Sequence, residues 1–95
     1  MVVDAGAVEA LAEQGRSLLS SGVRQVRGRF DAGAFVALAD ESGTEFARGV
    51  CNFSSADLQR IRGLHSVEVV RVLGQGGARE VIHRDHLVLA KELHQ

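Results

Sequence analysis

A cluster near the C-terminal end carries the densest set of chemically active side chains. Two histidines three residues apart, His83 and His86, flank Arg84 and Asp85. On a helix this spacing would place two metal ligands on one side, but the pattern here predicts strand and turn, where they would point to opposite faces. A structural zinc site also needs four ligands, and Cys51 is the only thiol. The cluster is better explained as a turn in which Asp85 accepts backbone N–H groups and Arg84 faces water or pairs with an acid.

The same cluster does not predict an acid–base pair. His83 and Asp85 would share a face of a strand, but no nucleophile or oxyanion donor lies nearby in the sequence. Cys51 stands among Val50 and Phe53, which is typical of a buried, inert thiol. We therefore predict no catalytic, cofactor-binding or metal-binding residues in this chain.

Arginines form the second chemically interesting group. Arg16, Arg24, Arg27 and Arg29 lie within or just after a glycine-bounded loop. The guanidinium fork suits phosphate, but alternation along a strand would separate Arg24 from the other two arginines of that strand. Two acids of the preceding helix, Glu9 and Glu13, also weaken the positive field. A solvated rim or a docking surface is the plainer interpretation.

The composition of the chain limits the functions that the arginines and histidines can serve. The chain has 95 residues, enough for one small domain, and 11 basic against 12 acidic residues leave no net basic field for nucleic acid. Phe30 and Phe35 are predicted to be core, so they offer no stacking platform for bases. A single cysteine suits a reducing cytosol, and no segment has the length of a membrane helix or a signal peptide. We expect a soluble, cytoplasmic chain whose start fits either a domain junction or a short gene.

The elements that must position these residues are short, because eleven glycines and no proline separate them. Asp4 stands at an N-cap position before a helical pattern over residues 5–14, and Gly15 is placed to end that helix. In the loop that follows, Leu18 and Leu19 are expected to point inward.

Alternation then predicts several strands and a second helix. Strands are expected at 23–30, 34–39, 44–52, 81–82 and 87–90, a helix between Ser54 and Gly63, and turns at 40–43 and 74–77. Segment 66–73 fits a strand by its valines and a helix by their spacing, so periodicity leaves it open. The whole order predicts an α+β fold, a small mixed-sheet pseudo-barrel with short peripheral helices, in a single domain over 1–95.

Seven short segments match one known family in the same order and with few gaps. Each match alone is a weak signal, but the ordered set is a strong one. They are residues 4–11, 15–19, 22–23, 30–33, 47–50, 52–55 and 81–85. The set resembles the C-terminal PUA domain of the glutamate 5-kinase family. The resemblance implies a PUA-like pseudo-barrel and favours a helix for 66–73, since that segment is helical in the family.

The resemblance also implies what the chain would do. Its parent would be a cytoplasmic, homo-oligomeric, ATP-dependent kinase that phosphorylates L-glutamate in proline biosynthesis. The chain has no phosphate-binding GxxxxGK[ST] or GxGxxG motif, so ATP, Mg²⁺ and glutamate would all bind on the kinase domain, its partner in the parent chain. This fragment is expected to be non-catalytic and to buttress the oligomer or tune its response to the pathway product.

In RNA-modifying PUA proteins, the loop after the first helix, with that helix and an adjoining strand, forms the nucleic-acid surface. On this chain the resemblance maps it onto Arg16, Ser17, Gly22 and Arg24, which we predict to be a nucleic-acid or domain-docking surface. A free-standing RNA-binding module is therefore the alternative function, with RNA as its partner.

The chain also departs from the family. The family commonly has tyrosines at Phe53, Gln75 and Ala78, an asparagine at His86, and a proline at Ser20. These positions are expected on caps, turns and the surface, so the fold should tolerate the changes, but they remove planar surface that could stack on a base.

Overall fold

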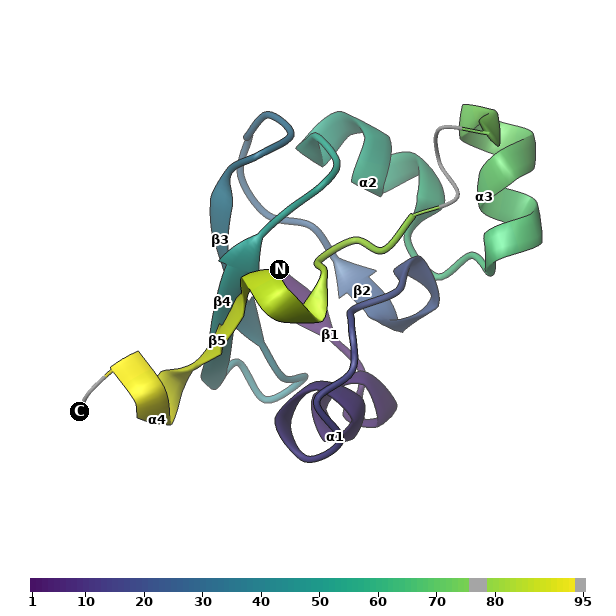
Figure 1. The fold of residues 1–95 in the computed structure, drawn as a ribbon. Coiled ribbons are helices and arrows are strands. Elements are labelled where there is room, and N and C mark those ends of the chain that lie inside the picture. The colour runs from purple at the N-terminus through teal and green to yellow at the C-terminus, as the bar shows by residue number, and fades with distance from the viewer. Residues whose placement is uncertain (76–78, 94–95) are drawn as a thin grey trace.

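The computed structural model describes residues 1–75 and 79–93 and contains a mixed five-stranded sheet with short helices (Figure 1). The elements are β1 Val2–Val3, α1 Ala5–Ala12, a 3-10 turn Ser20–Gly22, β2 Val23–Gln25, β3 Phe35–Ala39, β4 Glu45–Val50, α2 Ser55–Ile61, α3 Ser66–Leu73, a 3-10 turn Arg84–His86, β5 Leu87–Leu89 and α4 Ala90–Leu93. The strand order is β2-β1-β3-β4-β5, with β1 and β3 parallel and the other pairs antiparallel. The predicted α+β, mixed-sheet architecture is confirmed.

A bridge between two distant loops draws the edges of the sheet together. The Leu18 amide donates to the Ile82 carbonyl at 2.9 Å, and the Val81 amide donates to the Leu18 carbonyl at 2.8 Å. These segments lead into β2 and β5, the two edge strands, so the bridge gives the sheet its barrel-like curvature. The strand expected at 81–82 is reduced to this bridge.

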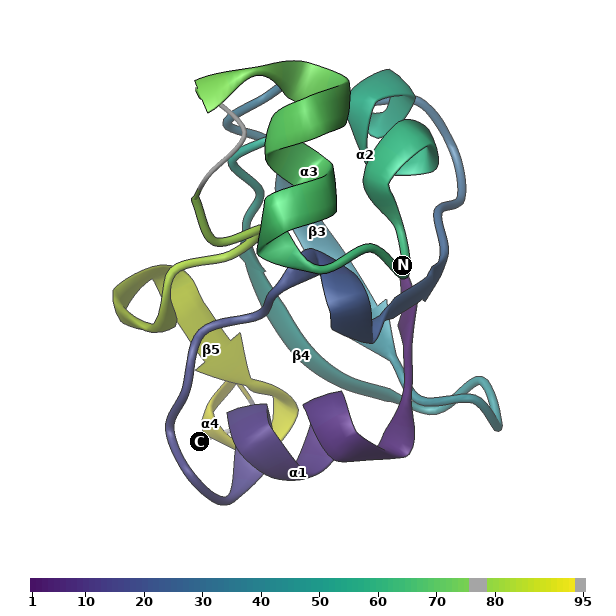
Figure 2. The ribbon, with the colours of Figure 1, turned by 90° about the vertical axis from the view of Figure 1, so that its right-hand side faces the viewer.

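One hydrophobic core fills the space between the sheet and the helices. Figure 2 shows α1, α2 and α3 in front of β3 and β4, on the same side of that hairpin. The largest fully buried side chains are Leu18, Leu38, Leu58, Ile61, Ile82, Val3, Val23, Val81 and Cys51. Burial of this much apolar surface is the main stabilising contribution in a chain of this size.

Local capping chemistry behaves as the sequence predicts. The Asp4 carboxylate accepts from the Ala7 amide at 2.8 Å, and the Ser54 hydroxyl accepts from the Asp57 amide at 3.1 Å. Gly63, which follows α2, takes a φ of 80°, a conformation that favours glycine. Segment 66–73 is a helix, as the family resemblance indicated.

The turn at 40–43 is organised by one carboxylate. The Asp40 side chain accepts from the backbone amides of Ser42 and Thr44, each at 3.0 Å. The Ser42 hydroxyl also donates to it, and these hydrogen bonds lower the pKa of Asp40 below its ordinary value. The turn therefore joins β3 to β4 as expected.

The strand predicted at 23–30 is wrong beyond Gln25. Gly28 has a φ of 75°, which breaks the extended conformation. The next segment bonds to α2 in place of a strand, because the Gln59 side chain donates to the Val26 carbonyl at 3.0 Å and the Phe30 amide donates to the Ser55 hydroxyl at 3.1 Å. Tertiary contacts thus override the alternation.

Two predicted core residues lie at the surface. Phe35 is 55% exposed and Leu19 is 52% exposed. On β3 the alternation buries Leu38, so Phe35, three residues away, faces the opposite side of the sheet. In the loop, Leu18 alone turns inward, because its backbone is held by the bridge to Ile82.

Element ends differ by a few residues from expectation. The first helix ends at Ala12, although Gly15 does take a left-handed φ of 62° just beyond it. The last strand stops at Leu89, and Ala90 begins α4. The turn predicted at 74–77 is only partly described: Gly74 has a φ of 79°, while residues 76–78, including Ala78, lie outside the described residues.

Candidate functional site

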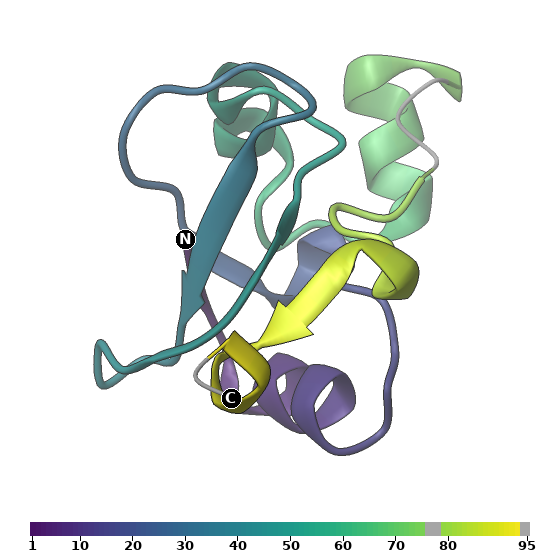
Figure 3. The ribbon, with the colours of Figure 1, turned by 60° about the vertical axis from the view of Figure 1, so that its left-hand side comes forward.

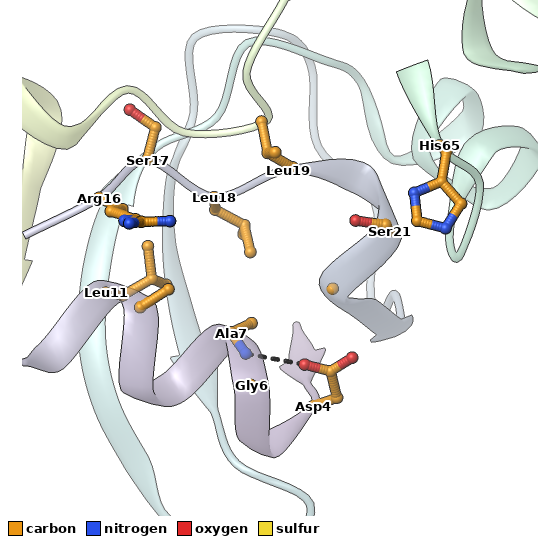
Figure 4. A pocket seen from close by; sticks show the side chains of 12 residues that line it. Asp4, Gly6, Ala7, Leu11, Arg16, Ser17, Leu18, Leu19, Ser21 and His65 are labelled. Carbon is orange, nitrogen blue, oxygen red and sulfur yellow. Dashed lines mark hydrogen bonds between the residues drawn. The ribbon is translucent and has the colours of Figure 1, made fainter. Parts of the chain in front are cut away.

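A pocket of about 450 Å³ opens between α1 and the segment that follows it (Figure 4). Its lining residues are Asp4, Gly6, Ala7, Ala10, Leu11, Arg16, Ser17, Leu18, Leu19, Ser21, Gly22 and His65. Apolar side chains of α1 and the loop form its floor, and polar groups stand at its two ends. Such a concave, mostly apolar space with a few polar groups is the usual form of a ligand site.

One wall is fixed by the start of α1. The Asp4 side chain caps the helix, while its own amide donates to the Gly22 carbonyl at 2.9 Å. This bond ties the first turn of the helix to the end of the 3-10 turn. This backbone hydrogen bond therefore holds the two walls together.

Gly22 allows the close approach of these walls. A Cβ atom at this position would lie 2.8 Å from the Cβ of Ala7, which is shorter than real side chains tolerate. Any larger residue would push α1 away from the 3-10 turn and widen the pocket. Gly22 was predicted to belong to a nucleic-acid or docking surface, and the structure shows that it permits the close packing of the two walls.

Arg16 and Ser17 lie together at one end of the pocket, as Figure 4 shows. Arg16 is exposed, and its amide donates to the Ala10 carbonyl at 3.0 Å, so the guanidinium is carried on an anchored backbone. The Ser17 hydroxyl accepts from the Arg84 amide at 2.9 Å and keeps its own proton for donation. This end can therefore present a cation and a hydroxyl donor to a bound anion.

Arg24 does not line this pocket. Its guanidinium lies 3.8 Å from the Asp4 carboxylate, with the arginine side chain 57% exposed, and its carbonyl accepts from Arg62 at 2.9 Å. Arg24 contributes to a neighbouring hollow of about 440 Å³ with Arg27, opposite the 40–43 turn. Of the four predicted surface residues, three share the pocket and the fourth stands on its rim.

Two further residues of the pocket, His65 and Ser21, were not among the predicted site residues. His65 precedes α3, and Ser21 belongs to the 3-10 turn; both stand at the end of the pocket opposite Arg16 (Figure 4). The backbone carries them there, because the buried Ser20 donates to the Leu64 carbonyl at 2.6 Å and its own carbonyl accepts from the Gly63 amide at 2.8 Å. Ser21 belongs to the loop that was predicted to form this surface, whereas only the tertiary pairing of the two loops could reveal His65.

The histidine cluster is a 3-10 turn with a different bonding pattern from the one predicted. The Asp85 carboxylate was expected to accept backbone N–H groups in this turn. The acceptor is instead the His83 imidazole, whose Nδ1 accepts from the Asp85 amide at 3.1 Å. That carboxylate lies 3.6 Å from the same Nδ1, and the His83 and His86 rings are 5.9 Å apart. Within residues 1–75 and 79–93, no three histidine, cysteine or acidic side chains gather as metal ligands would.

Cys51 is fully buried, as predicted. Burial raises the pKa of the Cys51 thiol above its ordinary value, which keeps it protonated and unreactive. Among the described helices, none is long and apolar enough to cross a membrane.

Comparison with known proteins agrees with this geometry. The profile of the PUA domain family matches residues 1–73. Among solved structures, a PUA domain from Aeropyrum pernix K1, a tartrate complex, has a TM-score of 0.65 at 31% identity, covering 90% of this chain and 40% of that one. A conserved PUA domain protein from Thermoplasma acidophilum has a TM-score of 0.54 at 19% identity over 62% of this chain and 38% of its own, which shows the fold alone.

The curated relatives are kinases of much greater length. Glutamate 5-kinases of Geobacter sp. (strain M21), Rippkaea orientalis and Thermus thermophilus are 55%, 46% and 49% identical over 94%, 92% and 97% of this chain. The chain spans about a quarter of their length, 24%, 24% and 25% respectively. The family resemblance read from the ordered segments is confirmed: the chain belongs to the PUA domain family and is homologous to the C-terminal PUA domain of glutamate 5-kinases.

Proposed function

We propose that this chain is the accessory PUA domain of a cytoplasmic glutamate 5-kinase, the enzyme that phosphorylates L-glutamate in proline biosynthesis. The observation that carries the proposal is the 55% identity to a glutamate 5-kinase over 94% of the chain. Its partner is the kinase domain of the same parent, itself a homo-oligomer. The role of the domain is regulatory or structural.

The pocket chemistry supports a non-catalytic role. Asp4 is committed to capping α1, Ser17 accepts a backbone amide, and Cys51 is buried away from the pocket. Ser21 and His65 stand together at the other end of the pocket, but among the described residues no hydrogen bond joins this hydroxyl to this imidazole, as a nucleophile and its base would require. ATP, Mg²⁺ and glutamate are therefore assigned to the part of the parent outside this chain.

The test compares three proteins: the pure 95-residue chain, the native gene product, and that product cut just before the position of Met1. We expect glutamate-dependent ATP turnover from the native product and none from the 95-residue chain. We expect the cut protein to keep turnover but to lose oligomer stability or its inhibition by proline. Turnover by the short chain, or a native gene product that ends at this length, would contradict the proposal.

A second candidate, RNA binding, is favoured by one observation: Arg16, Ser17 and Gly22 share a pocket with Arg24 on its rim. If RNA phosphates bind there, affinity should fall steeply between about 50 and 200 mM salt, with a slope set by the number of phosphates contacted. The Arg16→Ala, Arg24→Ala double variant should flatten the slope, while Arg71→Ala on α3 should not. Affinity that salt or these substitutions leave unchanged would reject RNA as a ligand.

A further inference from the structure

The sheet has an outer face that the helices leave uncovered at one end. Strand register places Phe35, Ala37, Arg48, Val50 and Val88 on this outer face, because Phe35 pairs with Val50, and Ala37 pairs with Arg48, which pairs with Val88. Figure 3 shows β3, β4 and β5 in front with α2 and α3 behind them. In Figure 1, α1, α2 and α3 all lie on the far side of the sheet from this face.

The exposed end of this face is apolar. Phe35 begins β3 and pairs with Val50 at one end of the hairpin. Helix α4 lies at the other end, because it follows the part of β5 that pairs with Ala47. The one charged group of the face is neutralised, since Arg48 donates to both carboxylate oxygens of Glu45 at 3.0 and 3.2 Å. What remains at the Phe35 end is a large aromatic ring, 55% exposed, with small apolar neighbours.

The edge of β3 beside this face is also open. The Met1 amine donates to the Ala37 carbonyl at 3.0 Å, and the Ala39 amide donates to the Met1 carbonyl at 2.9 Å. The N–H and C=O of one strand residue point the same way, so the Ala37 N–H and the Phe35 carbonyl face this same edge. Among the described residues, β1 reaches β3 only at its Ala39 end. Figure 3 places the N-terminus beside β3.

The parallel pairing fixes where a longer β1 would run. Residues added before Met1 would run along β3 from Ala37 toward Phe35. In this register, the second residue before Met1 would lie opposite the Ala37 N–H and the Phe35 carbonyl and could bond to both. We propose that the polypeptide preceding Met1 in the parent kinase extends β1 along this open edge, and that the domain it comes from covers the outer face at Phe35. This inference rests on the proposed function, and it uses the fact that the chain spans only 24% of its glutamate 5-kinase relatives.

Two matched cysteine variants test the inference in the native gene product and in the 95-residue chain. Phe35→Cys places a thiol on the outer face, and Val67→Cys places one on α3, where the side chain is 68% exposed. The native Cys51 is buried and serves as a silent reference. We expect the thiol introduced by Phe35→Cys to react at least about tenfold more slowly with maleimide in the native product than in the short chain, with the Val67→Cys thiol unchanged.

Hydrogen exchange of the unsubstituted proteins is a second measurement of whether the β3 edge is covered, and it needs no variant. The Ala37 amide should exchange at least about tenfold more slowly in the native gene product, with amides of α3 as the control. Equal labelling at Phe35→Cys, or equal exchange at Ala37, in a native product longer than 95 residues would overturn the inference while leaving the proposed function intact. A native product that ends at this length would overturn both.

Discussion

The two faces of the β3–β4 hairpin differ sharply although they alternate along the same strands. The inner face carries Leu38, Ala47 and Gly49, all buried against the core. The outer face carries Phe35 and Arg48, both exposed. The inner face is filled to contact distance, because a Cβ on Gly49 would lie 2.6 Å from Cγ2 of Ile82.

The two faces therefore have different roles in the domain. The inner face specifies the fold, since its side chains meet the bridge segment and the helices at close range. The outer face adds little to the fold of the chain alone, and its exposed aromatic ring fits contact with another domain. Substitutions on opposite faces should therefore differ several-fold in their effect on the free energy of unfolding.

The largest effect is expected for Leu38→Ala. This side chain is fully buried, and its loss removes apolar contacts and leaves a cavity, so the free energy of unfolding should fall by about 3 kcal/mol. The chain has no Trp or Tyr, so urea unfolding is best followed by far-UV circular dichroism. A loss below about 1 kcal/mol would mean that the inner face is loosely packed.

Gly49→Ala should have the next largest effect. The new methyl group would meet Ile82 and, at 2.9 Å, the carbonyl oxygen of His86, which cannot move without separating β5 from β4. We expect a destabilisation of about 2 kcal/mol in the same urea experiment. Gly6→Ala is the control, because its nearest contact would be 3.5 Å and alanine favours the helix. If both variants are equally stable, the close contact at Gly49 is not a constraint.

Asp4→Ala tests the wall of the pocket. Loss of the cap on α1 should cost about 1 kcal/mol, measured by thermal and urea unfolding. Asp4→Asn keeps a side-chain oxygen for the Ala7 amide and removes only the charge near Arg24, so it should lose less than half as much. Equal losses in the two variants would place the effect in the ion pair and not in the cap.

The smallest effect is expected for Phe35→Thr in the 95-residue chain. The ring is 55% exposed and lies on the outer face, so the free energy of unfolding should change by less than about 0.5 kcal/mol. The comparison with Leu38→Ala, three residues along the same strand, is the direct measure of the difference between the faces. A loss near that of Leu38→Ala would show that Phe35 belongs to the core after all.

Local signals predicted a large part of this fold. Asp4 and Ser54 cap the helices that follow them, and Asp40 organises its turn, because these interactions involve neighbours only a few residues away. The β3–β4 hairpin also follows from alternation on both sides of a tight turn. The family resemblance settled the helix at 66–73, which periodicity left open.

Other features depended on distant contacts. The strand predicted to continue to Phe30 ends at Gln25, since Gln59 and Ser55 of α2 bond to the segment that follows. Part of the candidate pocket was predictable, because Arg16, Ser17 and Gly22 are close in sequence. His65 was not predictable, since it is brought to the pocket by hydrogen bonds between the 3-10 turn and the loop before α3.

Patterns among neighbouring residues were enough to predict the class of fold, the helix starts, the turns and the membership in the PUA family, because capping, alternation and ordered short segments act over a few residues. Three features could be seen only in the folded chain: the face that Phe35 occupies, the contact between Gly22 and Ala7, and the open edge that β1 leaves on β3. The reason is physical: each of these depends on distances between segments far apart in the chain, which no pattern of neighbouring residues encodes.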